Sequence, residues 1–224
     1  MDNRLLRIFS FYNKSKNHAK FGISFGYYFI VNNLIVIGHP DQKSFCYNGI
    51  FKTIKENLAK DSTQKIEIID LYRDSFTRPR NKLIESYKKL VTWCNRIYIV
   101  SPVWWFRLTP RMEIFFDEVF EPGFAYKFIN ITKLYAYPKP MLSDKKVRTY
   151  VTHGAPALPV VTLYVNSVKL RLVMGVYTFV FGWRLSLFTK TKQFWSVPFV
   201  SESKRKKYLT RVTKDIISDL KEGK

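Results

Sequence analysis

Runs of consecutive apolar residues alternate along the chain with segments in which apolar residues recur every three or four positions. Leu34–Gly38 is a continuous run rich in β-branched residues, which is typical of a strand buried on both faces of a parallel sheet. The residues up to Lys60 have helical spacing, with Ser44 as a candidate cap, and Lys65–Leu71 has the pattern of a second strand. These segments predict one strand–helix–strand unit.

The alternation of strands and helices continues beyond this unit. The predicted helices are Lys82–Trp93, Pro110–Phe120, Val160–Val180 and Ser203–Leu220. The predicted strands are Arg96–Ser101, Val147–Thr152 and one within Trp183–Phe188. Strands separated by helices form parallel sheets, so the pattern predicts an α/β fold with a doubly wound, five-stranded parallel sheet and helices on both faces.

The first 33 residues differ from the rest, because basic and aromatic residues are mixed there and an apolar stretch follows. This order resembles an export signal, but no small-residue cleavage site precedes Asn32 and Asn33. The same asparagines interrupt the apolar stretch before it is long enough to span a membrane. We therefore expect residues 1–33 to form a basic and aromatic N-terminal extension, and residues 34–224 to form one domain.

The composition adds a strong positive charge to this picture. Across 224 residues, 38 Lys and Arg stand against 17 Asp and Glu, a net charge of +21, which favours anionic ligands, nucleic acid or anionic lipid. The 46% hydrophobic content argues against disorder of the chain as a whole. The basic run Lys204–Lys207 is read as a solvated helix face rather than a nucleic-acid patch.

Cysteine and histidine usage excludes two classes of structural site. The chain has 2 Cys, Cys46 and Cys94, and 3 scattered His, with no CxxC spacing. This spacing does not suit a structural zinc site, and two cysteines cannot build a disulfide framework. Free thiols favour a reducing compartment, so we expect a cytoplasmic protein.

Three loops that follow predicted strands carry candidate chemistry, because ligands of such sheets bind at the carboxyl ends of the strands. The loop from His39 leads into a helix N-terminus, where Lys43, Ser44 and backbone N–H groups can cradle a phosphate. Neither the GxGxxG nor the P-loop signature is present, so an ordinary capped turn remains an alternative.

The second loop, Pro102–Pro110, contains Trp104, Trp105 and Phe106 in a row. Successive residues leave an extended backbone on different sides, so we expect at least one ring to face a flat heteroaromatic ligand such as a flavin, although a protein interface is an equal alternative.

The third loop, Thr152–Pro156, offers the Thr152 hydroxyl and a close backbone approach at Gly154. Its His153 fits a hydrogen-bonded loop histidine or a proton-transfer group.

Together these loops resemble those of the flavodoxin-like NAD(P)H:quinone oxidoreductases, the family of DT-diaphorase, the modulator of drug activity and the potassium-efflux ancillary subunits. The resemblance runs from Leu34 to about Leu220. It rests on His39 with Ser44-Phe45, on Pro102-Val103-Trp104-Trp105-Phe106 with Gly123-Phe124-Ala125-Tyr126, and on Thr152-His153-Gly154.

The resemblance implies a flavin, FAD before FMN, with NAD(P)H as co-substrate and a homodimer with a substrate pocket between protomers. The residues implied to contact the cofactor are His39, Lys43, Ser44, Phe45, Cys46, Pro102, Val103, Trp104, Trp105, Phe106, Thr152, His153, Gly154 and Ala155. Those implied to contact the substrate are Tyr126, Phe128 and Tyr164.

Some positions depart from the family pattern. Cys46 replaces an asparagine, Phe128 replaces a tyrosine of some members, and Arg107 stands where some relatives have glycine. Arg107 is expected either to add charge near the flavin, to bind the phosphate of the nicotinamide dinucleotide, or to face solvent.

The sequence thus predicts a flavoprotein oxidoreductase that passes hydride from NAD(P)H to a quinone or similar flat acceptor in a ping-pong cycle, with no catalytic side chain and no metal. The alternative is a flavin-binding regulatory or electron-transfer subunit that docks on a membrane protein, and the charge keeps peripheral membrane association open. The loops do not favour nucleic acid as the partner.

Overall fold

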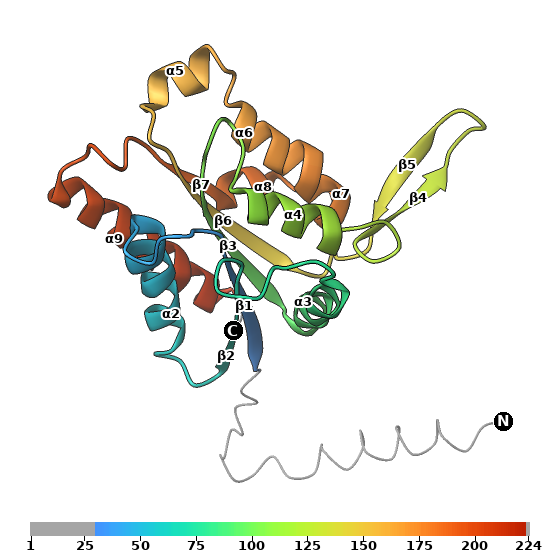
Figure 1. Cartoon of the computed structure of the whole chain (residues 1–224), viewed down its shortest axis with the longest axis horizontal. Helices are drawn as coiled ribbons and strands as arrows, with labels where there is room; N and C mark the ends of the chain where they lie inside the picture. The colour runs from blue at the N-terminus through green and yellow to red at the C-terminus, as the bar shows by residue number, and fades with distance from the viewer. Residues whose placement is uncertain (1–29, 223–224) are drawn as a thin grey trace, which may run out of the picture.

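The computed structural model describes residues 30–222, which form a twisted sheet with helices on both faces (Figure 1). The main sheet has the order β2-β1-β3-β6-β7, and every neighbouring pair is parallel. The predicted fold class is therefore confirmed. The strands are β1 (Val31–Ile37), β2 (Gln64–Asp70), β3 (Arg96–Pro102), β6 (Lys146–Thr152) and β7 (Thr191–Phe194).

Helices form one layer on each side of the sheet. One layer contains η2 (Phe45–Phe51), α2 (Lys52–Leu58) and α9 (Glu202–Lys221). The other contains α3 (Asn81–Trp93), α4 (Pro110–Val119), α6 (Ser167–Leu170), η3 (Arg171–Tyr177), α7 (Thr178–Phe181) and α8 (Leu185–Lys190). The short helix α5 (Ala157–Thr162) stands above the carboxyl edge of the sheet (Figure 1).

The continuous apolar run in β1 is explained by two separate cores. Leu34 and Val36 pack with α3 and α4, whereas Ile35 and Ile37 pack with η2, α2 and α9. Successive side chains of a strand point to opposite faces, so a strand covered on both sides needs apolar residues at every position. All four of these side chains are fully buried.

Strand β1 begins at Val31, before the Leu34 start that the apolar pattern predicted. Asn33 is fully buried in it, and its side-chain amide donates to the Val31 carbonyl at 3.0 Å and to Gln64 Oε1 at 3.0 Å. A buried polar group costs little when it is hydrogen-bonded, so the strand extends through this asparagine. The rest of the predicted extension, residues 1–29, lies outside the described residues.

Of the elements predicted after β6, one strand is wrong and one helix is interrupted. The segment predicted as a strand within Trp183–Phe188 contains most of α8, and the last strand is the short Thr191–Phe194. This strand lies at the sheet edge and has only two buried residues, so it lacks the apolar run on which the prediction relied. The predicted helix Val160–Val180 is broken at Val165 and Asn166, whose φ values of +49° and +50° no helix contains.

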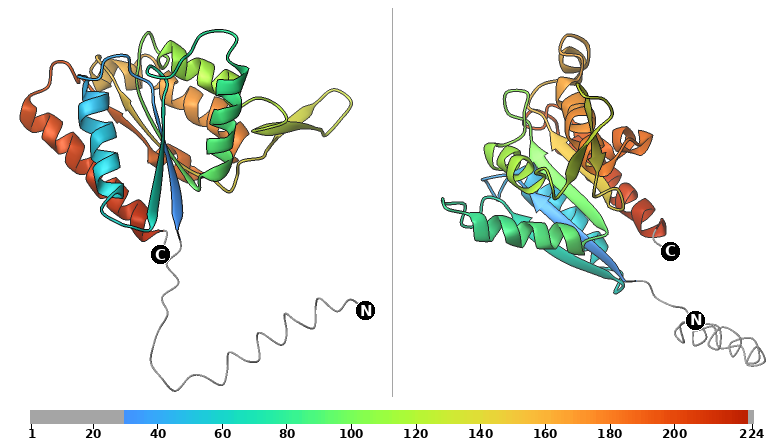
Figure 2. Two further views of the ribbon diagram at one scale, coloured as in Figure 1. Left: turned by 60° about the horizontal axis from the view of Figure 1, so that its bottom comes forward. Right: turned by 90° about the vertical axis from the view of Figure 1, so that its right-hand side faces the viewer.

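A two-stranded antiparallel hairpin projects from the body (Figures 1 and 2). It consists of β4 (Tyr126–Asn130) and β5 (Ala136–Pro140), and the sequence pattern predicted no element there. We call residues 126–140 the arm.

Candidate functional site

The loops that leave β1, β3 and β6 meet at the carboxyl edge of the sheet, where strand order reverses between β1 and β3. They enclose a cavity of about 440 Å³, which lies in the size range of small-molecule sites. Its lining residues are His39, Lys43, Ser44, Phe45, Cys46, Pro102, Val103, Trp104, Thr152, His153, Gly154, Val197, Pro198 and Arg205. The topology thus gathers most of the predicted cofactor residues around one space.

The first loop is held in shape by its own side chains. The His39 Nδ1 accepts from the Asp41 backbone N–H at 2.9 Å, and Asp41 Oδ1 accepts from the Lys43 N–H at 2.8 Å. Ser44 caps η2, because its hydroxyl accepts from the Tyr47 N–H at 3.3 Å. Burial lowers the pKa of His39, although Asp41 opposes the shift.

A buried contact joins the first loop to the third. Cys46 Sγ lies 3.1 Å from Thr152 Oγ1, and the Cys46 side chain is 2% exposed. Burial raises the pKa of Cys46 to about 12, so the thiol stays protonated at neutral pH and is a poor nucleophile. Cys46 therefore lines the cavity as a protonated thiol that links the first loop to the third.

The second loop makes a tight turn in which Trp104 and Arg107 exchange backbone hydrogen bonds of 2.7 and 3.1 Å. The two central residues, Trp105 and Phe106, have φ values of +50° and +61°. Bulky residues seldom adopt this left-handed conformation, and such outliers concentrate at functional sites.

The turn sends its three rings in different directions. Trp104 lines the cavity and lies edge-on to His39, with ring centroids 6.2 Å apart. Phe106 packs on Tyr164 at 4.5 Å, whereas Trp105 is 91% exposed. Arg107 is exposed and does not line the cavity, so its charge lies outside this space.

The third loop contains a neutral histidine. His153 is buried, stacks on Trp195 with ring centroids 4.1 Å apart, and its Nε2 lies 3.0 Å from Gln193 Nε2. Burial lowers the pKa of His153 to about 4. This geometry favours the hydrogen-bonded loop histidine over the proton-transfer group.

Gly154 leaves room for a ligand. A side chain built at this position would meet no protein atom within 4 Å, although the residue lines the cavity. Neighbouring protein atoms therefore do not require glycine here, and the space beside it is open.

Arg205 lines the cavity from α9, although the sequence pattern did not predict it. One of its Nη atoms donates to the Val197 carbonyl at 3.1 Å, which holds the guanidinium in place. Its Nε is buried and has no hydrogen-bond partner within residues 30–222. The basic run Lys204–Lys207 that was read as a solvated face thus turns one cation into the site. The signal available in the sequence was the cap residue Ser201, which starts α9 beside the cavity.

The remaining predicted residues lie elsewhere. Ala155 does not line the cavity, and its carbonyl accepts from the Ser196 N–H at 3.0 Å. Tyr126 and Phe128 belong to the arm, with ring centroids 5.5 Å apart, and neither reaches the cavity of its own chain. Tyr164 packs against Phe106 of the second loop and does not line the cavity.

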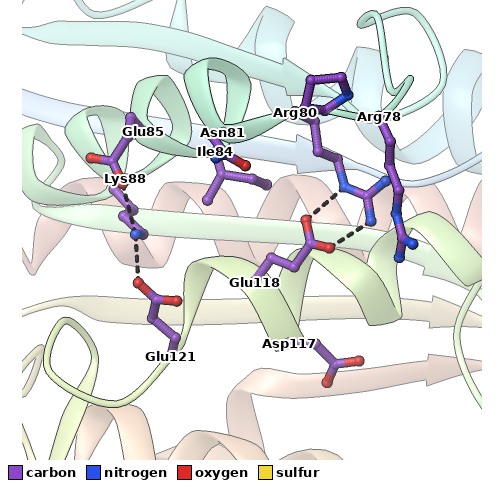
Figure 3. Close-up of a pocket in the computed structure, with 10 residues that line it drawn as sticks. Arg78, Arg80, Asn81, Ile84, Glu85, Lys88, Asp117, Glu118 and Glu121 are labelled. Atoms are coloured by element: carbon purple, nitrogen blue, oxygen red, sulfur yellow. Dashed lines mark hydrogen bonds and ion pairs between the residues drawn. The ribbon is translucent and has the colours of Figure 1, made fainter.

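A larger groove of about 710 Å³ lies between the start of α3 and the end of α4 (Figure 3). Its charged side chains largely neutralise one another: Arg80 Nε donates to Glu118 at 2.6 Å, and Lys88 donates to Glu85 at 2.8 Å and Glu121 at 2.6 Å. These pairs tie α3 to α4, so we assign the groove a structural role.

Within residues 30–222, no three or more His, Cys, Asp or Glu side chains are grouped to hold a metal ion. In the same range, no helix is both long and apolar enough to cross a bilayer.

Comparison with known proteins agrees with this geometry. The family model described as flavodoxin-like fold matches residues 32–162, which is more than half of the chain. The chain belongs to the flavodoxin-like fold family. This flavodoxin-like protein is also 22% identical over 138 residues to an uncharacterised NAD(P)H oxidoreductase of Haemophilus influenzae, a match that covers 56% of this chain and 65% of that protein.

Two solved structures share the fold of this flavodoxin-like protein. The NAD(P)H:quinone oxidoreductase of Methanothermobacter marburgensis has a TM-score of 0.64 at 18% identity, over 83% of this chain and 95% of that one. The FMN-dependent NADH-azoreductase of Bacillus anthracis, solved with FMN, has a TM-score of 0.63 at 15% identity, over 84% and 98%.

Proposed function

We propose that this protein is a flavin-dependent oxidoreductase that transfers hydride from NAD(P)H to a quinone or similar flat acceptor in a ping-pong cycle. One observation carries the proposal: the three loops that resemble the family enclose a single cavity at the carboxyl edge of the sheet. The names of the Haemophilus and Methanothermobacter proteins support the same reaction class.

The cavity residues fit the two ends of a flavin. At one end Lys43, Ser44 and Arg205 supply a charge, a hydroxyl and a guanidinium with a free buried Nε, which suit phosphate oxygens. At the other end Pro102 and Trp104 provide a flat wall, and the open space at Gly154 lets the backbone approach a ring.

A flavin held by these residues would supply the redox chemistry between the nicotinamide and the acceptor. The protein residues bind and orient. Trp104 and Pro102 cover one side of the cavity, and Thr152 and Gly154 line it from the third loop. Cys46 stays protonated and His153 neutral at pH 7, so neither side chain exchanges a proton. In this proposal one cavity serves the donor and then the acceptor, so the oxidised nicotinamide leaves before the acceptor binds.

Two observations favour different flavins. The sequence resemblance favours FAD, whereas the FMN in the Bacillus anthracis azoreductase favours FMN. A homodimer completes the proposal, because the arm of one copy is the element that can bring Tyr126 and Phe128 to the cavity of the other. We also assign the protein to the cytoplasm, where Cys46 and Cys94 remain free thiols.

The visible absorption spectrum of the purified protein tests the proposal. We expect flavin bands, or their recovery after reconstitution with FAD or FMN, and consumption of NAD(P)H with a soluble quinone. A variant that fills the open space, Gly154→Val, should bind flavin roughly tenfold more weakly or worse while remaining folded. The control is Gly175→Val, an exposed glycine remote from the cavity. A colourless protein that binds neither flavin overturns the proposal, and bound flavin without turnover indicates a regulatory subunit.

A further inference from the structure

The tip of the arm exposes apolar side chains that nothing in residues 30–222 covers. Leu134 is 99% exposed, Ile131 62% and Tyr135 56%, and the arm stands clear of the body (Figure 2). An isolated two-stranded hairpin is marginally stable in water. Its exposed apolar side chains contribute to stability only when another surface removes them from water. Such a patch marks an interaction site.

The same arm is cationic. No Asp or Glu occurs between Pro122 and Ser143, whereas Lys127, Lys133 and Lys139 lie in this segment. Lys127 stands directly opposite Lys139 across the two strands, and among the described residues no acidic group pairs with either. Like charges directly opposite repel, so an anionic surface beside the arm relieves this repulsion.

The charged and apolar side chains share one face of the arm, with the charges nearer the body and the apolar side chains nearer the tip. Lys127 and Lys139 are near the body, and the pair Ile129 and Tyr137 comes next along the same face. The Ile131 N–H donates to the Tyr135 carbonyl at 2.9 Å, which continues the hairpin to the apolar tip. Tyr126 and Phe128 alternate onto the opposite face, so the proposed dimer contact and this face do not compete.

We propose that the tip of the arm inserts into the interfacial region of an anionic lipid bilayer. Leucine and isoleucine gain by leaving water for acyl chains, tyrosine suits the boundary between the two, and lysine adds electrostatic attraction to acidic headgroups. A nucleic acid offers the same negative charge but nothing that an exposed leucine or isoleucine would bind. The arm docks the protein on the surface without spanning the bilayer, and the net charge of +21 strengthens the attraction. This inference is independent of the flavin.

Flotation of the full chain with lipid vesicles tests the proposal. We expect binding to vesicles of phosphatidylcholine with phosphatidylserine, weak binding to phosphatidylcholine alone, and a decrease at high salt. The double variant Ile131→Ser, Leu134→Ser should lower partitioning roughly tenfold or more. The matched control is Leu158→Ser, Leu163→Ser, which removes two leucines that are 74% and 78% exposed outside the arm. Equal binding by the two double variants overturns the proposal, since residues 1–29 are present in both.

A fluorescent label reports insertion directly. Leu134→Cys can be labelled selectively with an environment-sensitive dye, because Cys46 and Cys94 are both buried. We expect a blue shift on anionic vesicles, and no shift when the label is at Lys55→Cys on α2, across the molecule from the arm (Figure 1). A shift that needs no vesicles and increases with protein concentration identifies a second copy as the occupant, and overturns the proposal, as does no shift at all.

Discussion

Arg205 is the residue whose role the structure changes most. Its neighbours in the basic run, Lys204, Lys206 and Lys207, are exposed, whereas Arg205 reaches the cavity with an unpaired buried Nε. A planar guanidinium with donors in a fixed fork binds phosphate oxygens better than a flexible ammonium. Arg205 is therefore the strongest candidate for a phosphate ligand among the residues that line the cavity.

Replacing Arg205 by Gln should weaken flavin binding by roughly 10-fold to 100-fold, the range expected for loss of hydrogen bonds to a charged group. The measurement is a fluorescence titration of flavin-free protein with FAD and FMN, and Lys206→Gln is the matched control on the same helix. Equal dissociation constants for the two variants would falsify the assignment.

Burial of His153 makes stability depend on pH. Its pKa falls from 6.5 to about 4 on folding, so the unfolded chain binds a proton more strongly between these values. Above pH 6.5 the histidine is neutral in both the folded and the unfolded chain, and its burial leaves the free energy of unfolding independent of pH. As the pH falls toward 4, protonation of the unfolded chain lowers the free energy of unfolding by about 3 kcal/mol.

Urea unfolding at a series of pH values measures this dependence. His153→Gln should flatten the slope between pH 6.5 and 4, whereas His39→Gln, at a half-buried site, should keep most of it. An unchanged slope in His153→Gln would show that other groups cause it.

At the scale of elements, α9 is attached to the sheet by one buried carboxylate. Asp219 accepts from Arg148 Nε at 2.6 Å and Nη2 at 2.7 Å, and its own carbonyl accepts from Arg96 at 2.6 Å. Burial alone would raise the pKa of Asp219, but the hydrogen bonds and charge of Arg148 lower it. The helix that carries Arg205 at its start is thus fixed to β3 and β6 at its end.

Asp219→Asn should lower the free energy of unfolding by about 3 kcal/mol or more, because buried Arg148 keeps only its longer 3.5 Å pair with Asp215 and buried Arg96 loses its nearby negative charge. In the wild type this contribution is complete above the unfolded pKa near 3.8 and disappears as the pH falls through the lower folded value. Chemical denaturation at pH 7 measures the change, with Asp215→Asn as the control because its oxygen lies 3.5 Å from Arg148. A loss no larger than that of the control would contradict the role of Asp219.

Elements with strong periodicity could be predicted from the sequence, and elements determined by tertiary contacts could not. The strand Arg96–Pro102 and the helix Asn81–Trp93 agree with the predictions within a residue or so, because their apolar residues face well-packed cores. The short strand Thr191–Phe194 forms because it completes the sheet beside β6, and its own residues carry little pattern. The arm was missed for a similar reason, since none of its exposed residues faces a core.

At the scale of the whole molecule, the loops of the candidate site were predictable because each directly follows a strand. Strand order then places His39, Trp104 and Thr152 at one edge of the sheet. Val197, Pro198 and Arg205 could not be found this way, since they reach the cavity from a segment that follows the last strand. The two exposed aromatic positions, Trp105 and Phe106, also differ from expectation, because the left-handed turn directs them away from the cavity.

The late position of Arg205 in the chain also matters during synthesis. A ribosome makes the three strand-end loops first, and the cavity then lacks both its arginine and the wall formed by Val197 and Pro198. Arg205 joins the cavity only with α9, whose far end is held to the sheet by the ion pair between Asp219 and Arg148. On the proposed function, a nascent chain gains its full affinity for a phosphate-bearing ligand only when the last helix has docked, so ligand capture would mark the completion of folding.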